Sequence, residues 1–123
     1  MTAREAVLKA ADAAPAGIEG RFRVTIQSAG AQNGHVYLDS ERDYRDQRNL
    51  AVDLCPESLK SMKAKFGDDL EHELLGKELE ITGIARRVKI VFLADGKPTD
   101  KYYYQTHLLV CSANQVTLVK PSA

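Results

Sequence analysis

Apolar and polar residues alternate along the first half of the chain with the period of two that is typical of half-buried strands. In residues 20–30 (GRFRVTIQSAG), Phe22, Val24 and Ile26 alternate with charged and polar positions. The sequence AQNG then predicts a turn. Two further strands are expected at residues 35–40 (HVYLDS) and 49–55 (NLAVDLC). The pattern therefore predicts three consecutive strands.

Two segments have the apolar spacing of helices instead. Residues 2–14 place alanines and Val7 at helical intervals before Pro15. Residues 56–66 begin with a proline at a first-turn position and end before Gly67. The apolar positions in this second helix are Leu59, Met62 and Phe66. We expect an N-terminal helix and a second helix directly after the third strand.

Two long strands are expected in the rest of the chain. In residues 76–94 one face of the expected strand is first formed by the odd-numbered positions Leu79, Ile81, Gly83 and Ala85. The apolar residues then occupy even-numbered positions, at Val88, Ile90 and Phe92. This change predicts a β-bulge near Arg86 and Arg87. After a DGKPTD loop, the last strand begins at KYYYQTHLLVC and runs on irregularly through residues 112–115 into VTLV.

The resulting order, three strands, a helix and two strands, is the layout of the five-stranded OB-fold barrel. The length of 123 residues suits one domain, and 44% hydrophobic residues suffice for a core. We expect an N-terminal helical extension at residues 1–17 and an OB-fold barrel domain at residues 18–120. The fold class is all-β with one inter-strand helix.

Four phrases carry a resemblance to a known group: GIEGRFRVTIQSAG, HVYLDSERDYRDQRNLAVDL, LLGKELEITGIARRV and KYYYQTHLLV. Over residues 17–119 the chain resembles a bacterial OB-fold, nucleic-acid-binding-like domain. The resemblance implies that single strands lie across the face of the second and third strands, flanked by two loops. It also implies that GRFRVTI and GKELEITG are antiparallel neighbours.

Charge and composition limit the function classes. The 17 Lys and Arg balance 17 Asp and Glu, so no overall basic field attracts nucleic acid from a distance. The sequence has no run of 18 apolar residues and no signal-peptide h-region, so we expect a soluble protein without membrane insertion. A cytoplasmic location is the default, and an exported form whose signal has been removed is the alternative. No oligomeric state is predicted.

Catalysis is not expected. The three histidines, His35, His72 and His107, fall on different elements, and the sequence has neither a phosphate cradle nor a nucleophile elbow. The acids Asp39, Asp43, Asp46 and Asp53 are interpreted as solvated loop acids paired with Arg42, Arg45 and Arg48, rather than as a cation site. We expect no metal and no cofactor.

The leading interpretation is a binding module that holds single-stranded DNA or RNA weakly, through stacking and local basic charge. The candidate contact residues are Arg86, Arg87, Lys89, Lys97, Lys101, Tyr37, Tyr44, Tyr102, Tyr104, Arg42, Arg45 and Arg48. Tyr102, Tyr103 and Tyr104 point alternately to two faces of a strand, so they cannot all stack on one ligand.

Two alternatives remain open. The charged loop ERDYRDQR between the second and third strands is balanced, so a solvated turn is favoured over a contact surface. A protein partner could instead dock on the barrel face or the N-terminal helix. Salt dependence separates this class from nucleic-acid binding, since only the latter should weaken steeply with salt.

The two cysteines, Cys55 and Cys111, are too few for a disulfide scaffold, and two buried thiols are the favoured interpretation. In the OB-fold layout, however, the third and fifth strands are parallel neighbours and these cysteines follow them. Both should therefore emerge at the same rim, at a Cα separation that a disulfide can span. Whether they are bonded depends on the compartment.

Overall fold

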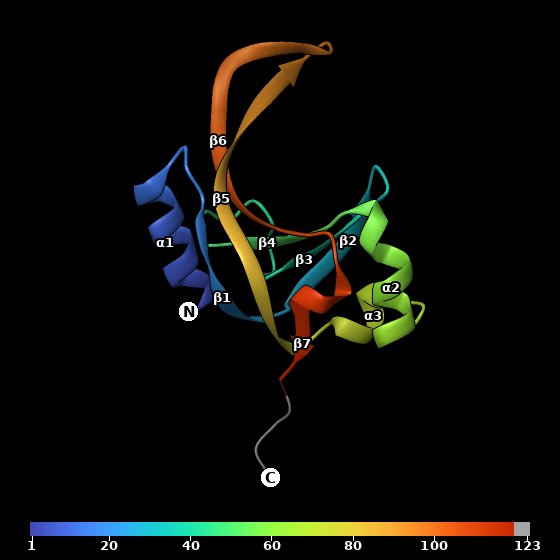
Figure 1. Ribbon diagram of the computed structural model, residues 1–123. Coiled ribbons are helices and arrows are strands. Elements are labelled where there is room, and N and C mark those ends of the chain that lie inside the picture. The colour runs from blue at the N-terminus through green and yellow to red at the C-terminus, as the bar shows by residue number, and fades with distance from the viewer. Residues whose placement is uncertain (120–123) are drawn as a thin grey trace.

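The computed structural model, which describes residues 1–119, is a mostly β structure with helices at its sides (Figure 1). The strands are β1 (Ile18–Thr25), β2 (Ser28–Gln32), β3 (His35–Asp39), β4 (Leu50–Leu54), β5 (Glu78–Ala94), β6 (Lys97–Val110) and β7 (Val116–Leu118). The helices are α1 (Ala3–Ala13), α2 (Pro56–Phe66), α3 (Leu70–Leu74) and the 3₁₀ turn η1 (Ala113–Gln115). The strands form one sheet in the order β1-β5-β6-β4-β3-β2, with β7 paired to β5.

The structure agrees with the prediction of a mostly β fold with helices, but the sheet has seven strands where five were expected and it is open. The first predicted strand is split at Ile26 and Gln27, because the chain changes partner there from β5 to β3. The Ile26 amide donates to the Lys77 carbonyl and the Gln27 amide to the Asp39 carbonyl. The last predicted strand is also split, because η1 interrupts it before β7. The single inter-strand helix is in fact a pair, α2 followed by α3.

The core confirms the alternation seen in the sequence. Phe22, Val24 and Ile26 are almost fully buried, and Leu50, Val52 and Leu54 on β4 are fully buried. β4 pairs in parallel with β6, and β1 pairs antiparallel with β5, both as expected. Ile81 of β5 lies between Phe22 on one side and Val116 on the other.

Helix α1 packs against β1 and β5 through its smallest residues. Ala6 and Ala10 are fully buried, because alanine allows the helix backbone to approach the sheet closely. Thr2 and Glu5 form a capping box that satisfies two free amides at the helix start. The division into residues 1–17 and 18–120 remains a prediction, and its last residue lies outside the described part of the chain.

The bulge predicted near Arg86 and Arg87 is misplaced. Pairing between β5 and β6 is regular from Ala85 to Val91, and the register shifts only between Val91 and Leu93. The apolar residues of β5 move from odd-numbered to even-numbered positions because β5 and its partner β6 leave the core after Ala85. Residues 86–105, here called the hairpin arm, lie beyond the residues of β5 and β6 that pair with β1, β4 and β7. The arm projects beyond the rest of the sheet (Figure 1).

No helix within residues 1–119 has the length and apolar character needed to cross a membrane.

Candidate functional site

A groove of about 620 Å³, here called the tyrosine groove, opens on the side of the sheet opposite the core. It is lined by residues 28–32 of β2 and by Tyr37, Asp39, Arg42, Tyr44, Ala51, Ile90, Tyr103, Gln105 and His107. The register explains this grouping. Tyr37 lies opposite Asp53, Asp39 opposite Ala51, and Ala51 opposite His107, so their side chains share one face of the sheet.

Aromatic rings dominate this surface. The Tyr37 and His107 rings are tilted, with centroids 6.2 Å apart, and the His35 and Tyr37 rings are stacked, with centroids 5.9 Å apart. Tyr103 reaches the groove from the hairpin arm, where it packs against Phe92. Tyr44 comes from the loop between β3 and β4 and is 56% exposed. The groove therefore offers rings from three separate segments.

The pKa values of two rings in the groove, His107 and Tyr37, are shifted toward the neutral form. Burial lowers the pKa of His107, whose Nε2 lies 2.8 Å from Gln105 Oε1, so the ring is neutral near pH 7. Burial, reinforced by the negative charge of Asp53, raises the pKa of Tyr37, which keeps its hydroxyl protonated. The surface is therefore suited to stacking more than to ionic contact.

A buried polar network fixes the loop that supplies Arg42 and Tyr44. Asn49 is 3% exposed and donates from Nδ2 to Asp39 Oδ1 at 2.9 Å and to the Tyr44 carbonyl at 3.3 Å. Its Oδ1 accepts from the Glu41 amide at 3.0 Å. Sequence reasoning missed Asn49, although an asparagine at the end of a charged loop is a signal for such a bracing role.

Two of the four acids interpreted as solvated loop acids are in fact buried strand residues. Asp39 accepts from Asn49, and burial raises its pKa above the ordinary value. Asp53 lies with its Oδ1 2.6 Å from His35 Nδ1. Both were misplaced because their strands carry polar residues on the face opposite the core.

The remaining acids do pair with arginines of the charged loop. Asp43 Oδ1 accepts from the Arg45 amide and side chain, and Asp46 accepts from the amide and guanidinium of Arg48. Each pair closes a short turn two residues long. Arg45 and Arg48 are therefore engaged within the loop, and Arg42 is the loop arginine that lines the groove.

This pairing has a measurable consequence at Asp46. The hydrogen bonds from the Arg48 side chain, and then from its amide, lower the pKa of Asp46 to about 2. The pair should add stability above the ordinary pKa, and this contribution should be lost as the pH falls from about 4 toward 2. We expect Arg48→Ala to move the pKa of Asp46 back toward its ordinary value, measured by NMR titration of the carboxyl carbon. Arg42→Ala is the matched control, and identical Asp46 titrations in Arg48→Ala and the wild type would contradict the assignment.

The basic residues predicted on the fourth and fifth strands do not form one patch. Arg87 stacks over Tyr104 at 3.9 Å and Lys89 over Tyr102 at 4.2 Å, both on the face of the hairpin arm away from Tyr103. Arg86 lies opposite His107 and lines a second, smaller hollow. Lys97 and Lys101 are exposed on the outer half of the hairpin arm.

Of the twelve predicted contact residues, the structure brings three to the tyrosine groove: Tyr37, Arg42 and Tyr44. Tyr102 and Tyr104 share one face, as expected from alternation, and their rings are 5.6 Å apart. The groove residues of β5 and β6, which sequence reasoning did not propose as contacts, are Ile90, Tyr103, Gln105 and His107. Strand alternation could have placed Tyr103 opposite its two neighbours, but not in a groove with Tyr37.

No protein-family model matches the sequence, and no curated protein matches it. Among solved structures, the chain is similar to an aspartyl tRNA synthetase from Entamoeba histolytica, with a TM-score of 0.49 and 13% identity over 92% of this chain. It is also similar to a putative aspartyl-tRNA synthetase from Leishmania major Friedlin, with a TM-score of 0.47 and 9% identity over 100% of this chain. The chain spans 21% of the length of each. At these values neither likeness assigns the chain to a family.

Proposed function

We propose that this protein is a non-catalytic module of the OB-fold type that binds single-stranded nucleic acid in the tyrosine groove. The strand order supports the fold assignment. If β1 and β2 are counted as one bent strand, then β3, β4, β5 and β6 follow in the order of a partly open five-stranded Greek-key barrel, with α2 and α3 in the expected place. β7 is then an addition to this barrel.

The observation that carries the functional proposal is the grouping of Tyr37, Tyr44 and Tyr103 around one groove. Bases stack on aromatic side chains with a contribution of about 1–3 kcal/mol each, whatever their sequence. Rings from three segments can contact successive bases, whereas Tyr102 and Tyr104 each have a cation within 4.2 Å of the ring centroid, closer than the 5.7 Å between Arg45 and the Tyr44 ring. The groove is therefore the better stacking surface.

The electrostatics favour weak binding that depends on local contacts. Arg42 lines the groove and can contact a phosphate, while the balanced net charge of zero provides no long-range attraction. The polar groups of Asp39, Gln105 and His107 already have hydrogen-bond partners. These features support a role in holding a strand without changing it.

Alanine substitution at two adjacent tyrosines tests the proposal. We expect Tyr103→Ala to weaken binding of labelled single-stranded DNA or RNA by about 1–3 kcal/mol, or roughly 5- to 150-fold in Kd, because one stacking surface is lost. Tyr103→Phe should bind nearly as well as the wild type. The measurement is fluorescence anisotropy at low and moderate salt.

Tyr102→Ala is the matched control, because this residue lies on the same strand but faces away from the groove. It should leave Kd almost unchanged. Equal weakening by Tyr102→Ala and Tyr103→Ala would point to the other face of the hairpin arm, and the absence of salt-sensitive binding would reject the nucleic-acid proposal altogether.

A protein partner is the second candidate, because the hairpin arm exposes large apolar residues near its tip. Val91, Phe92 and Leu93 are 38%, 50% and 65% exposed. Such a cluster is typical of protein contact surfaces. Val91→Ser combined with Leu93→Ser should abolish a contact of this kind while leaving groove binding intact, because neither residue lines the groove.

A further inference from the structure

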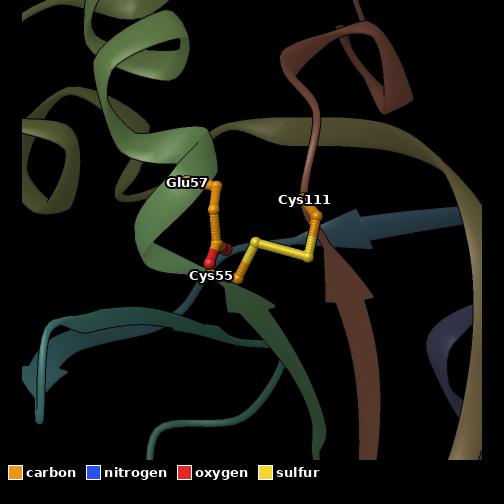
Figure 2. Close-up of side chains that lie close together, drawn as sticks. All are labelled: Cys55, Glu57 and Cys111. Atoms are coloured by element: carbon orange, nitrogen blue, oxygen red, sulfur yellow. A yellow bond between two sulfur atoms is a disulfide. The ribbon is translucent and has the colours of Figure 1, made fainter.

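Two cysteines and a glutamate meet at the rim where β4 and β6 end (Figure 2). Cys55 follows β4 and Cys111 follows β6, their Cα atoms are 5.3 Å apart, and a disulfide joins them. Glu57 lies in the first turn of α2 with its carboxylate beside the disulfide. One ligand atom from each of the three residues lies within 4.8 Å of the others.

We propose that the reduced protein binds Zn²⁺ through the thiolates of Cys55 and Cys111 and the carboxylate of Glu57. The disulfide is the metal-free oxidised form, so the bond and the ion exclude each other. This site lies outside the tyrosine groove and does not depend on the function proposed for it.

The spacing of the three side chains suits tetrahedral zinc. Zn–S bonds of about 2.3 Å and Zn–O bonds of about 2.0–2.2 Å place the two sulfurs and the carboxylate oxygen about 3.5–3.8 Å apart. Ligand atoms that already lie within 4.8 Å reach this spacing by small side-chain rotations once the sulfurs are no longer bonded. Three protein ligands leave the fourth position for water.

The backbone at both cysteines is held independently of the disulfide. The Cys55 amide donates to the Val110 carbonyl at 2.9 Å, and the Cys111 amide donates to Gln115 Oε1 at 2.9 Å. Reduction therefore leaves both sulfurs at the same rim. A pair of thiolates beside a carboxylate concentrates negative charge, which a divalent cation neutralises.

Helix α2 favours the thiolate that the metal requires. Cys55 is the N-cap of this 11-residue helix, and its side chain makes no capping hydrogen bond. The positive end of the helix stabilises a negative sulfur at this position. Cys111 is exposed whereas Cys55 is 4% exposed, so an external thiolate reaches Cys111 and Cys55 leaves as the stabilised thiolate.

A dithiol can convert the disulfide form of the protein into the reduced form. A small-molecule dithiol supplies two electrons and two protons and becomes a cyclic disulfide, while Cys55 and Cys111 become thiols. Zn²⁺ binding then releases two protons from these thiols. An oxidised dithiol reverses the reaction and releases the ion.

Anaerobic titration with Co²⁺, a coloured substitute for Zn²⁺, tests the site. We expect the reduced wild type to bind one Co²⁺ per chain with a thiolate-to-metal charge-transfer band, which Zn²⁺ abolishes by displacement. The oxidised protein and Cys111→Ser should show no such band. Glu57→Gln should bind at least about tenfold more weakly, because one ligand is lost. Glu73→Gln, which removes an exposed carboxylate from α3, is the matched control.

Circular dichroism on the same samples separates metal binding from folding. If reduction unfolds the chain, Zn²⁺ should restore the native spectrum, because binding free energy contributes to folding. Three results would each overturn the proposal: a reduced wild type without a thiolate band, equal affinities of Glu57→Gln and Glu73→Gln, or an unfolded reduced chain that Zn²⁺ does not restore.

Discussion

Replacement of Ile81 by alanine is expected to lower the free energy of unfolding by about 2–5 kcal/mol. Ile81 is fully buried at the centre of β5, with Phe22 and Val116 as its partners on the two neighbouring strands. Truncation removes buried methyl groups and leaves a cavity that paired strands on both sides cannot easily close. Val52→Ala on β4, also fully buried, should act in the same direction.

Ile84→Ala provides the matched control for this prediction. Ile84 is on the same strand, but it faces away from the core and is 48% exposed. Its truncation should change the free energy of unfolding by well under half as much, because little buried area is lost. Urea denaturation of the three variants measures both effects. Equal midpoints for Ile81→Ala and Ile84→Ala would contradict the assignment of Ile81 to the core face and Ile84 to the outer face of β5.

Loss of the Cys55–Cys111 disulfide is expected to cost about 4 kcal/mol. The bond joins residues 56 positions apart, and closing a loop of this length restricts the unfolded chain by roughly that amount in the chain-entropy model. A dithiol added in the presence of a metal chelator should therefore lower the unfolding midpoint of the wild type markedly. The chelator matters because Zn²⁺ should offset part of the loss.

The double variant Cys55→Ser, Cys111→Ser controls for other effects of the reductant. It should unfold at lower urea concentrations than the wild type, and its midpoint should not respond to the dithiol. A wild-type midpoint that reduction leaves in place would mean that the bond does not form in solution or does not constrain the unfolded chain.

The elements that the sequence predicted correctly are those set by local periodicity. Alternation placed Phe22, Val24 and Ile26 on the core face of β1 and its extension, and helical spacing identified α1 and α2. The OB-fold layout also predicted that β4 and β6 are parallel neighbours. This placed Cys55 and Cys111 at one rim, although free thiols were the favoured interpretation.

The errors arise where a residue's surroundings depend on partners far along the chain. The parity change from Ala85 to Val88 was interpreted as a bulge because apolar residues were assumed to face one core. In the structure the strand pairs regularly there, and Ile90 instead faces the tyrosine groove. The first strand was not expected to divide, because no residue pattern marks an exchange of partners at Ile26 and Gln27.

The candidate site could be predicted only in part for the same reason. Tyr37 was identified as an aromatic residue on a strand, and Arg42 and Tyr44 as a basic and an aromatic residue in the loop that follows it. These are local properties, and all three residues line the groove. Arg87 and Lys89 were expected to be available to a ligand, yet each lies over a tyrosine on the next strand. Cross-strand pairs of this kind depend on register, which a single strand does not specify.

The sequence by itself determined the helices α1 and α2 and the buried faces of β1 and β4, because side-chain direction repeats with a fixed period along a helix and alternates along a strand. Only the tertiary structure decided that Tyr103 joins Tyr37 and Tyr44 in one groove and that Glu57 lies beside the two cysteines. Those groupings depend on the register between strands and on the exit of the hairpin arm from the core. Both are set by contacts between residues far apart in the sequence, which no local pattern records.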